Sequence, residues 1–297
     1  SKHIKKNGKK RGKQQYKCLD CGKQFVEKEE VNQETMYHDY VFGKQTIKQI
    51  SEKYGISKST VQRRFKAIHS EIIISKDKEI VVLMDTTYWG WDFGVVVMKD
   101  AKRKKILWRK YIDRKEKLSD YEEGIQWLEG KGFKIKGIVC DGLRGIYKTF
   151  AKYKIQMCQF HQVQIIRRYL TQKPELEASK ELMKITRLLT ITDKYSFIGM
   201  YNEWRDKWKD FINERRTDEK GKRVYIHRRL RSASLSIKRN MPYLLTWYDN
   251  KELGIPNTNN ALEGKFTDLK TKLRNHNGLS KEHRKIFIDK YFKETFK

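Results

Sequence analysis

The sequence has little cysteine and no long apolar run. Four cysteines in 297 residues are too few for a disulfide-stapled scaffold, so we expect a reducing, cytoplasmic environment. No stretch of about 20 consecutive apolar residues occurs, which argues against a membrane-spanning helix. The opening residues contain neither an initiator methionine nor a secretory signal. We therefore expect a fragment or a processed chain of a cytoplasmic protein.

Acids are scarce relative to bases. Lysine and arginine total 67 against 37 aspartates and glutamates, which gives a formal net charge of +30. This excess lies along the whole chain and raises the self-repulsion of the folded protein. The composition therefore predicts a nucleic acid as the partner, with an acidic membrane surface as the alternative. The length is enough for about two domains.

A cysteine knuckle lies in the basic segment 1–30. Cys18 and Cys21 are separated by two residues, a spacing that can hold half of a tetrahedral zinc site. Only one such pair is present, and His3 is poorly placed to complete it. We interpret residues 1–30 as a partial zinc ribbon, and we leave open whether Zn²⁺ binds there or the spacing arose by chance.

Residues 35–75 have the pattern of a helix-turn-helix. Apolar residues recur at helical spacing on both sides of Gly55, which marks the turn, and Ser57 can cap the second helix. The buried face of that helix is expected to comprise Val61, Phe65 and Ile68. The face expected to contact DNA comprises Lys58, Ser59, Thr60, Gln62, Arg63 and Arg64. The alternative is an ordinary helical hairpin with a solvated basic face.

Residues 78–170 have the pattern of an α/β segment. Three β-rich stretches joined by short turns predict an antiparallel meander. Two later strands alternate with helices, so we expect them to run parallel to the first strand. The five strands are expected at 79–85, 91–100, 104–112, 134–141 and 154–161. This is the order of a ribonuclease H-like core with a mixed five-stranded sheet.

The rest of the chain has helical patterning. Residues 171–250 contain no convincing strand, so we expect an all-helical insertion. Residues 251–297 are expected to complete the core with a last helix that begins at Pro256-Asn257-Thr258. The apolar stripe of this helix comprises Leu262, Phe266, Leu269 and Leu273, whose spacing of four, three and four residues places them on one face.

Three carboxylates are expected to converge at the end of this sheet. Asp85 ends the first strand, Asp141 ends the fourth, and Glu263 lies in the first turns of the last helix. Neighbouring carboxylates repel unless a cation or a proton lies between them. Oxygen ligands suit two Mg²⁺ or Mn²⁺ ions, which can activate a nucleophile for attack on a phosphodiester. Taken singly, the three acids could also be a turn residue, a helix cap and a solvated helix residue.

At these acids the chain resembles a known family. The stretches "LMDTTYWG", "VCDGLRG", "CQFHQVQ" and "NTNNALEGKF" are similar to the surroundings of the DDE triad in bacterial insertion-sequence transposases of the Mutator-related superfamily. The long gap between Asp141 and Glu263 matches the helical insertion of that family. The resemblance implies a nucleoid-associated enzyme that binds element ends, hydrolyses phosphodiester bonds and joins 3′-hydroxyl ends to target DNA. It also implies a homodimer or higher oligomer on DNA. Relatives with a zinc ribbon have two cysteine pairs, whereas this sequence has one.

Further residues are candidates for supporting roles. Cys158 and His161 are either zinc ligands, a core cysteine beside a hydrogen-bonded histidine, or, as the resemblance implies, support for the active site. Trp204 and Trp208 are one helical turn apart and are expected either to pack in the core or to stack on unpaired bases. Lys270 and Arg274 lie along the same edge of the last helix as Glu263. We expect these two side chains to hold the DNA backbone.

Two other functions fit the same features. A structure-specific nuclease with a ribonuclease H-like core would cut DNA without joining ends. A regulator with an inactive core would bind DNA without cutting it, although the presence of all three acids argues against that interpretation.

Overall fold

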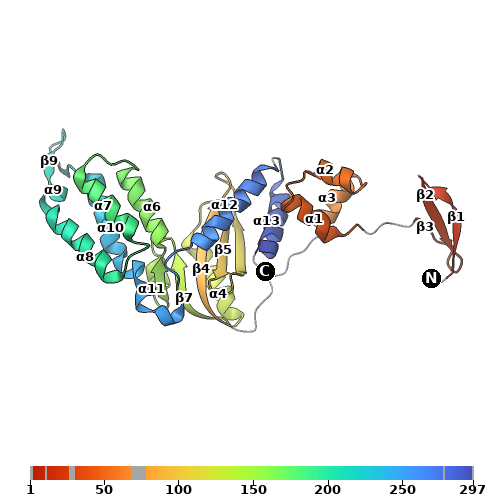
Figure 1. The fold of residues 1–297 in the computed structure, drawn as a ribbon, viewed down its shortest axis with the longest axis horizontal. Helices are drawn as coiled ribbons and strands as arrows, with labels where there is room; N and C mark the ends of the chain where they lie inside the picture. The colour runs from red at the N-terminus through yellow and green to blue at the C-terminus, as the bar shows by residue number, and fades with distance from the viewer. Residues whose placement is uncertain (1–2, 11, 27–30, 68–77, 277, 296–297) are drawn as a thin grey trace. The chain divides into compact units, whose positions relative to one another are not determined.

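The computed structural model describes residues 3–10, 12–26, 31–67, 78–276 and 278–295. The chain divides into two compact units, Ser1–Ile68 and His69–Lys297. The first unit contains both the cysteine knuckle and the predicted helix-turn-helix. The second contains the sheet, the helical insertion and the last helices, each visible in Figure 1.

The first unit begins with a small antiparallel sheet. Its strands are β1 (Ile4–Lys10), β2 (Lys13–Cys18) and β3 (Gln24–Val26), in the order β1-β2-β3. Three helices follow, α1 (Gln33–Val41), α2 (Ile47–Lys53) and α3 (Lys58–Lys66).

Local capping defines the turn between α2 and α3. Thr46 and Gln49 form a capping box at the start of α2, which satisfies two otherwise free backbone donors. Gly55 adopts a φ of 60°, a conformation that glycine allows at little cost. The Ser57 hydroxyl accepts a hydrogen bond from the Thr60 amide at 3.2 Å. The predicted helices, turn and cap are therefore confirmed. Val61 and Phe65 are buried, whereas Ile68 lies outside the described residues.

A mixed five-stranded sheet forms the centre of the second unit. The strands are β4 (Glu79–Tyr88), β5 (Gly94–Asp100), β6 (Ile106–Ile112), β7 (Lys134–Cys140) and β8 (Lys154–Met157). Their order is β6-β5-β4-β7-β8. The β4–β5 and β5–β6 pairs are antiparallel, and the β4–β7 and β7–β8 pairs are parallel. The predicted mixed sheet is confirmed. Two expected strand ends are wrong, because β4 continues past Asp85 to Tyr88 and β8 ends at Met157, so that His161 lies on the following helix.

Strand β4 is buried on both of its faces. Ile80, Val82 and Met84 pack in a cluster that includes residues of α4 (Leu118–Gly130) and Ile146 of α5 (Ile146–Thr149). The alternate residues Val81 and Leu83 pack with Cys158 and Ile255 in a second cluster. Because side chains alternate along a strand, Asp85 lies on the same face of β4 as Val81 and Leu83, which is the face packed with Cys158.

The insertion is a helical bundle with one strand pair. It comprises α6 (Gln159–Leu170), α7 (Glu177–Leu188), α8 (Lys194–Lys207), α9 (Lys209–Asn213) and α10 (Arg228–Leu244), which stand beside the sheet in Figure 1. The expectation of an all-helical insertion is wrong, because β9 (Arg215–Thr217) and β10 (Arg223–Tyr225) form an antiparallel hairpin between α9 and α10. Strands this short carry too few residues to show a period of two.

The chain then returns to the sheet. After α11 (Thr246–Asp249) and the 3₁₀ turn Lys251–Leu253, the helices α12 (Asn260–Arg274) and α13 (Lys281–Thr295) contact β4 and β6 respectively. Helix α12 begins four residues later than we expected from Pro256. Its predicted stripe of Leu262, Phe266, Leu269 and Leu273 is buried and confirmed. Within the described part of the chain, no helix is long and apolar enough to span a membrane.

Candidate active site

The register of the sheet places Asp85 beside Asp141. On the parallel pair β4–β7, Val81 lies opposite Gly137 and Leu83 lies opposite Val139, so partners differ by 56 in residue number. Asp141 minus Asp85 is also 56, so the two acids continue the same row. Neighbouring strands are about 4.8 Å apart. The two carboxylates therefore emerge from adjacent backbones at the carboxyl end of the parallel strands.

Glu263 reaches this edge because the start of α12 is attached to β4. The side-chain amide of Asn259 donates a hydrogen bond to the carbonyl of Met84 at 3.0 Å, one residue before Asp85. The backbone amide of Asn259 donates to the Cys158 sulfur at 3.2 Å. The Glu263 amide in turn donates to the Asn259 carbonyl at 3.1 Å. One buried asparagine thus connects the last acid to the first.

Electrostatics indicate that the three acids are neighbours. Asp85 is 7% exposed, and its pKa is raised well above the ordinary range by burial and then by the negative charges of Asp141 and Glu263. Burial also raises the pKa of Glu263. Like charges gathered in a partly desolvated site are costly without a cation or a proton.

The carboxylate oxygens of Asp85 and Asp141 are suitable ligands for a hard divalent cation. One oxygen of Asp85 accepts the Thr86 amide at 2.8 Å, and one oxygen of Asp141 accepts the Leu143 amide at 3.1 Å. Each bond uses one oxygen and fixes the orientation of its carboxylate. The second oxygen of each carboxylate takes no part in these two bonds. Carboxylates held in this way suit Mg²⁺ or Mn²⁺, which prefer oxygen ligands.

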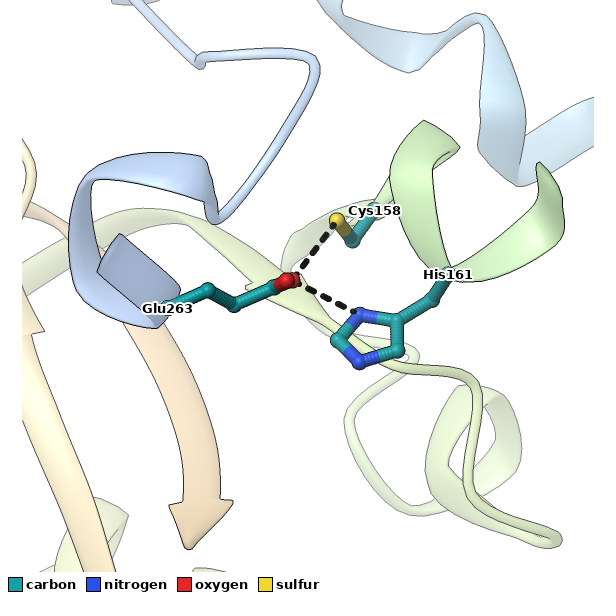
Figure 2. Close-up of side chains that lie close together, drawn as sticks. All are labelled: Cys158, His161 and Glu263. Carbon is teal, nitrogen blue, oxygen red and sulfur yellow. Dashed lines mark hydrogen bonds and ion pairs between the residues drawn. The ribbon is translucent and has the colours of Figure 1, made fainter. Parts of the chain in front are cut away.

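Cys158 and His161 lie beside Glu263, as Figure 2 shows. The Cys158 sulfur is 4.0 Å and the His161 Nδ1 is 3.5 Å from Oε1 of Glu263. Burial raises the pKa of the Cys158 thiol to about 11, so the group is a protonated donor at neutral pH. The positive charge of a protonated His161 opposes the effect of burial on Glu263. Both side chains therefore contact an acid of the predicted triad.

Buried glutamines hold the segment that carries Cys158. Gln156 and Gln159 each donate a side-chain hydrogen bond to the Leu244 carbonyl at 2.9 Å. Gln162 donates to Ser236 at 3.0 Å and accepts from Asn240 at 2.7 Å. These bonds attach the end of β8 and the start of α6 to α10. A buried polar network of this kind is stable because its members satisfy one another.

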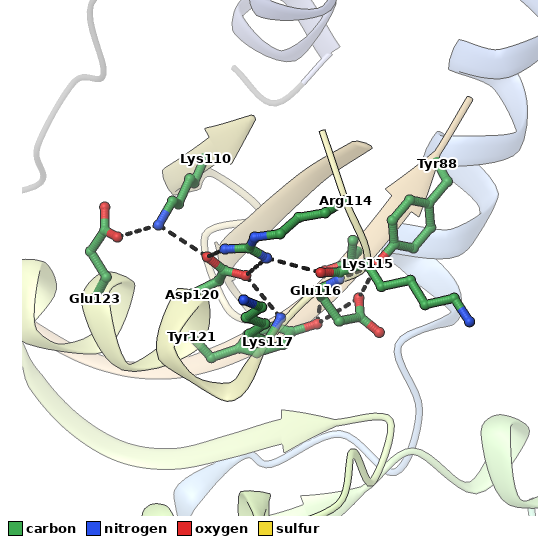
Figure 3. Close-up of polar contacts among 10 residues, drawn as sticks. Tyr88, Lys110, Arg114, Lys115, Glu116, Lys117, Asp120, Tyr121 and Glu123 are labelled. Atoms are coloured by element: carbon green, nitrogen blue, oxygen red, sulfur yellow. Dashed lines mark hydrogen bonds and ion pairs between the residues drawn. The ribbon is translucent and has the colours of Figure 1, made fainter. Parts of the chain in front are cut away.

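Sequence reasoning missed a fourth acid, Glu116, which Figure 3 shows beside Tyr88 and Tyr121. Its Oε2 accepts hydrogen bonds from the Tyr88 hydroxyl at 3.0 Å and from the Tyr121 hydroxyl at 3.4 Å. Burial raises the pKa of Glu116, and the charge of Asp141 adds to that rise. The charge of Glu116 also contributes to the raised pKa of Asp85. No local motif marks this residue, because its partners come from β4 and α4.

Asp120 fixes the loop that carries Glu116. The buried carboxylate accepts two bonds from the Arg114 guanidinium at 2.8 and 2.9 Å, and one from the Lys117 amide at 2.8 Å. Lys110 forms a further ion pair with it at 3.0 Å. The hydrogen bonds from Arg114 are the main reason that the pKa of Asp120 lies well below its usual range. Figure 3 shows this network at the start of α4.

The residues predicted to contact DNA on α3 divide into two groups. Lys58, Ser59, Gln62 and Arg63 are exposed along one face of the helix. Thr60 is half-buried, and its hydroxyl lies 2.9 Å from that of Ser57 at the helix cap. Arg64 is also half-buried, with one guanidinium nitrogen enclosed. The first group presents its side chains to solvent, and its contact with DNA stays a prediction.

Trp204 of α8 and Trp208, which lies between α8 and α9, do not present free ring faces. Trp204 is 3% exposed, and its indole nitrogen donates to the Ala178 carbonyl at 2.9 Å. Base stacking by Trp204 is therefore a wrong prediction, because a four-residue spacing does not reveal which face is buried. Trp208 is half-buried and donates to Glu181 at 2.7 Å, with the Lys207 ammonium 5.1 Å from its ring centroid.

Trp91 is the exposed tryptophan that sequence reasoning passed over. It is 89% exposed in the turn between β4 and β5, at the end of β4 that carries Asp85. The signal was available in the sequence, since a tryptophan directly after Gly90 in a tight turn has few neighbours to cover it.

Basic side chains lie on α12 and on the β9–β10 hairpin. Lys270 is half-buried and Arg274 is exposed. The exposed bases of the hairpin are Arg215, Arg216, Lys220, Lys222 and Arg223. The guanidinium groups of Arg215 and Arg231 lie 4.4 and 4.1 Å from the centroid of the Tyr225 ring. These cation–π contacts order the hairpin arginines.

The cysteine knuckle has the expected turn. Cys18 is buried and Cys21 is exposed, and the Cys21 amide donates to the Cys18 sulfur at 3.4 Å. His3 lies 3.3 Å from Asp20. Among the described residues, Cys158, His161 and Glu263 are the one group of three potential metal ligands whose ligand atoms all lie within 4.8 Å of one another. The ligand atoms of Asp85, Asp141 and Glu263 are not gathered to that distance. Zinc binding at Cys18 and Cys21 stays a prediction.

No protein-family model matches the chain, and no curated protein matches it in sequence. The function must therefore be inferred from the geometry and chemistry of the residues themselves.

Proposed function

We propose that this chain is a DDE transposase of a bacterial insertion sequence, built on a ribonuclease H-like core. The observation that carries the proposal is the shared offset of 56 residues in the β4–β7 register and between Asp85 and Asp141. The tether from Asn259 to the Met84 carbonyl brings Glu263 to the same edge. Three acids from separate elements at one sheet edge suit a two-metal centre for phosphodiester chemistry.

Each acid has a distinct structural role in this proposal. Asp85 and Asp141, which are oriented by the Thr86 and Leu143 amides, would hold two Mg²⁺ or Mn²⁺ ions, and Glu263 would complete the ligand set. The bound ions supply activation of a water or a 3′-hydroxyl and stabilisation of the leaving oxygen. Cys158 and His161 support the site by fixing the position of the Glu263 carboxylate.

The basic surfaces would hold DNA. Exposed Lys58 and Arg63 on α3 are suited to contact element ends in the manner of a recognition helix. Lys270 and Arg274 on α12 would hold the DNA backbone near Glu263, and the β9–β10 hairpin adds a cluster of exposed arginines and lysines. Cutting two element ends together calls for a homodimer or a higher oligomer, acting on the bacterial nucleoid.

The proposal is tested by incubating the protein with DNA that contains the element ends and with Mn²⁺. Products in which 3′-ends are joined to target DNA support the transposase. Nicks without joining would instead indicate a structure-specific nuclease, and binding without either product would indicate a regulator. Asp141→Asn should abolish both products, whereas Asp113→Asn, which changes an exposed acid in the turn after β6, should leave them unchanged.

A further inference from the structure

Cys158, His161 and Glu263 form a compact group of mixed ligands. One potential ligand atom from each lies within 4.8 Å of the other two. Cys158 is the N-cap residue of α6, His161 lies in the first turn of α6, and Glu263 lies in the first turn of α12, so two anchored helix ends define the geometry. Sulfur, nitrogen and oxygen together select a softer cation than the three carboxylates do.

We propose that these three side chains form a second cation site, specific for a thiophilic divalent ion such as Zn²⁺, which shares Glu263 with the acid site. A tetrahedral zinc ion with ordinary bond lengths separates a sulfur and an oxygen ligand by about 3.5 Å, and a nitrogen and an oxygen ligand by about 3.3 Å. The corresponding separations in the structure are 4.0 and 3.5 Å. Small side-chain rotations are enough to close the differences.

The surroundings give a cation access to the three ligands. They also leave a fourth ligand position open. The side chains of His161 and Glu263 are 28% and 24% exposed, so an ion approaches the buried Cys158 sulfur from their side. On binding, the thiol releases its proton to the buffer, because the thiolate is the ligand. Three protein ligands leave a fourth position for water.

Sharing Glu263 has a consequence for the proposed enzyme. A carboxylate bound to zinc beside Cys158 and His161 contributes less charge to the Asp85–Asp141 site. Zinc would therefore inhibit Mg²⁺-dependent DNA cleavage by drawing Glu263 away from the reactive edge. This step rests on the proposed function, whereas cation binding does not.

Cation binding can be measured with Cd²⁺, a spectroscopic probe for zinc sites. A full-length variant with Cys18→Ser and Cys21→Ser removes the other vicinal thiols. Titration with Cd²⁺ should produce an ultraviolet thiolate-to-cadmium band that saturates at a single equivalent. Adding Cys158→Ser should abolish the band. His161→Ala, which changes a side chain near the surface, should weaken Cd²⁺ affinity by at least about 10-fold, a loss seen even for outer partners of metal ligands.

Cys140 provides a matched control. It is a buried free cysteine at the end of β7, and Cys140→Ser should leave the band intact. Absence of the band in the background variant would overturn the proposal, as would a band that survives Cys158→Ser or an affinity unchanged by His161→Ala.

The activity arm separates this inference from the proposed function. With Mg²⁺ present, Zn²⁺ should inhibit cleavage of end-containing DNA in the background variant. Measured against its own rate without zinc, the added His161→Ala variant should lose this inhibition, whatever the substitution does to that rate. Cleavage that zinc does not affect would refute the inhibitory role while leaving the transposase intact. A cadmium band in a protein that never cleaves DNA would uphold the cation site and refute the proposed function.

Discussion

Replacing Asp85 by asparagine should stabilise the protein when divalent cations are absent. Asp85 is buried beside Asp141, and its pKa is raised because burial and three neighbouring carboxylates disfavour its charge. The folded state therefore pays an electrostatic cost whenever Asp85 is ionised. Asparagine has nearly the same shape and carries no charge, so Asp85→Asn removes that cost.

The size of the effect follows from the strand register. Two unit charges separated by the strand spacing of about 4.8 Å repel by about 3.5 kcal/mol at an effective dielectric constant of about 20. This figure counts the charge of Asp141 alone, and it is reduced where the raised pKa leaves part of the Asp85 population protonated. For a unit of about 150–250 residues, each kcal/mol shifts the melting temperature by about 2–4 °C. A rise of up to about 7–14 °C is therefore expected.

Thermal unfolding in mildly alkaline buffer measures this effect, with EDTA or with Mg²⁺. Wild-type protein should gain about 2.7 kcal/mol when Mg²⁺ is present at 100 times its dissociation constant. Asp85→Asn should melt higher than wild type in EDTA and gain less from Mg²⁺. Asp100→Asn is the matched control, because Asp100 is a buried acid on β5 with Arg103 at 2.6 Å. That variant should melt lower in both buffers.

The reasoning would be refuted by a lower melting temperature for Asp85→Asn in EDTA, with the fold intact by circular dichroism. It would also be refuted if Mg²⁺ and Mn²⁺ left the melting temperature of the wild type unchanged.

Three further predictions concern the supports of the site and the DNA surface. Asn259→Ala should cost about 1–3 kcal/mol in urea unfolding and reduce DNA cleavage, because it removes the tie between α12 and β4; full cleavage would contradict it. Lys58→Ala with Arg63→Ala should lower the salt slope of binding to labelled element ends by about 1.8, since each phosphate contact contributes about 0.9; an equal slope would assign this face to another role. Asp120→Asn should cost about 1.5–3 kcal/mol at neutral pH. The pKa of Asp120 is lowered in the folded state, so the contribution of its carboxylate to folding stability is complete above the ordinary aspartate range and is lost as the pH falls below about 4. The free energies of unfolding of wild type and variant should therefore converge as the pH falls below about 4, and differ at neutral pH.

Much of the core could be predicted because its signals are local. The β-branched runs gave the strands of the mixed sheet, and the Gly55 turn with the Ser57 cap gave the α2–α3 pair. Even the adjacency of Asp85 and Asp141 followed from strand order, because both acids come at the carboxyl ends of neighbouring parallel strands.

The remaining features depend on tertiary contacts. Glu116 reaches the site through tyrosines at positions 88 and 121, and nothing in its own neighbourhood indicates this. Trp204 is buried, and its indole nitrogen donates a hydrogen bond to the buried carbonyl of Ala178. The link from Asn259 to Met84 spans 175 residues. Periodicity cannot reveal contacts between side chains so distant in sequence.

The position of divalent ions in the protein bound to DNA tests the central claim most directly. In a crystal of this complex containing Mn²⁺, anomalous scattering should place ions within about 2.1 Å of carboxylate oxygens of Asp85 and Asp141, with Glu263 as a further ligand. Anomalous peaks away from Asp85 and Asp141, or an ordered site on DNA without any peak, would contradict the account.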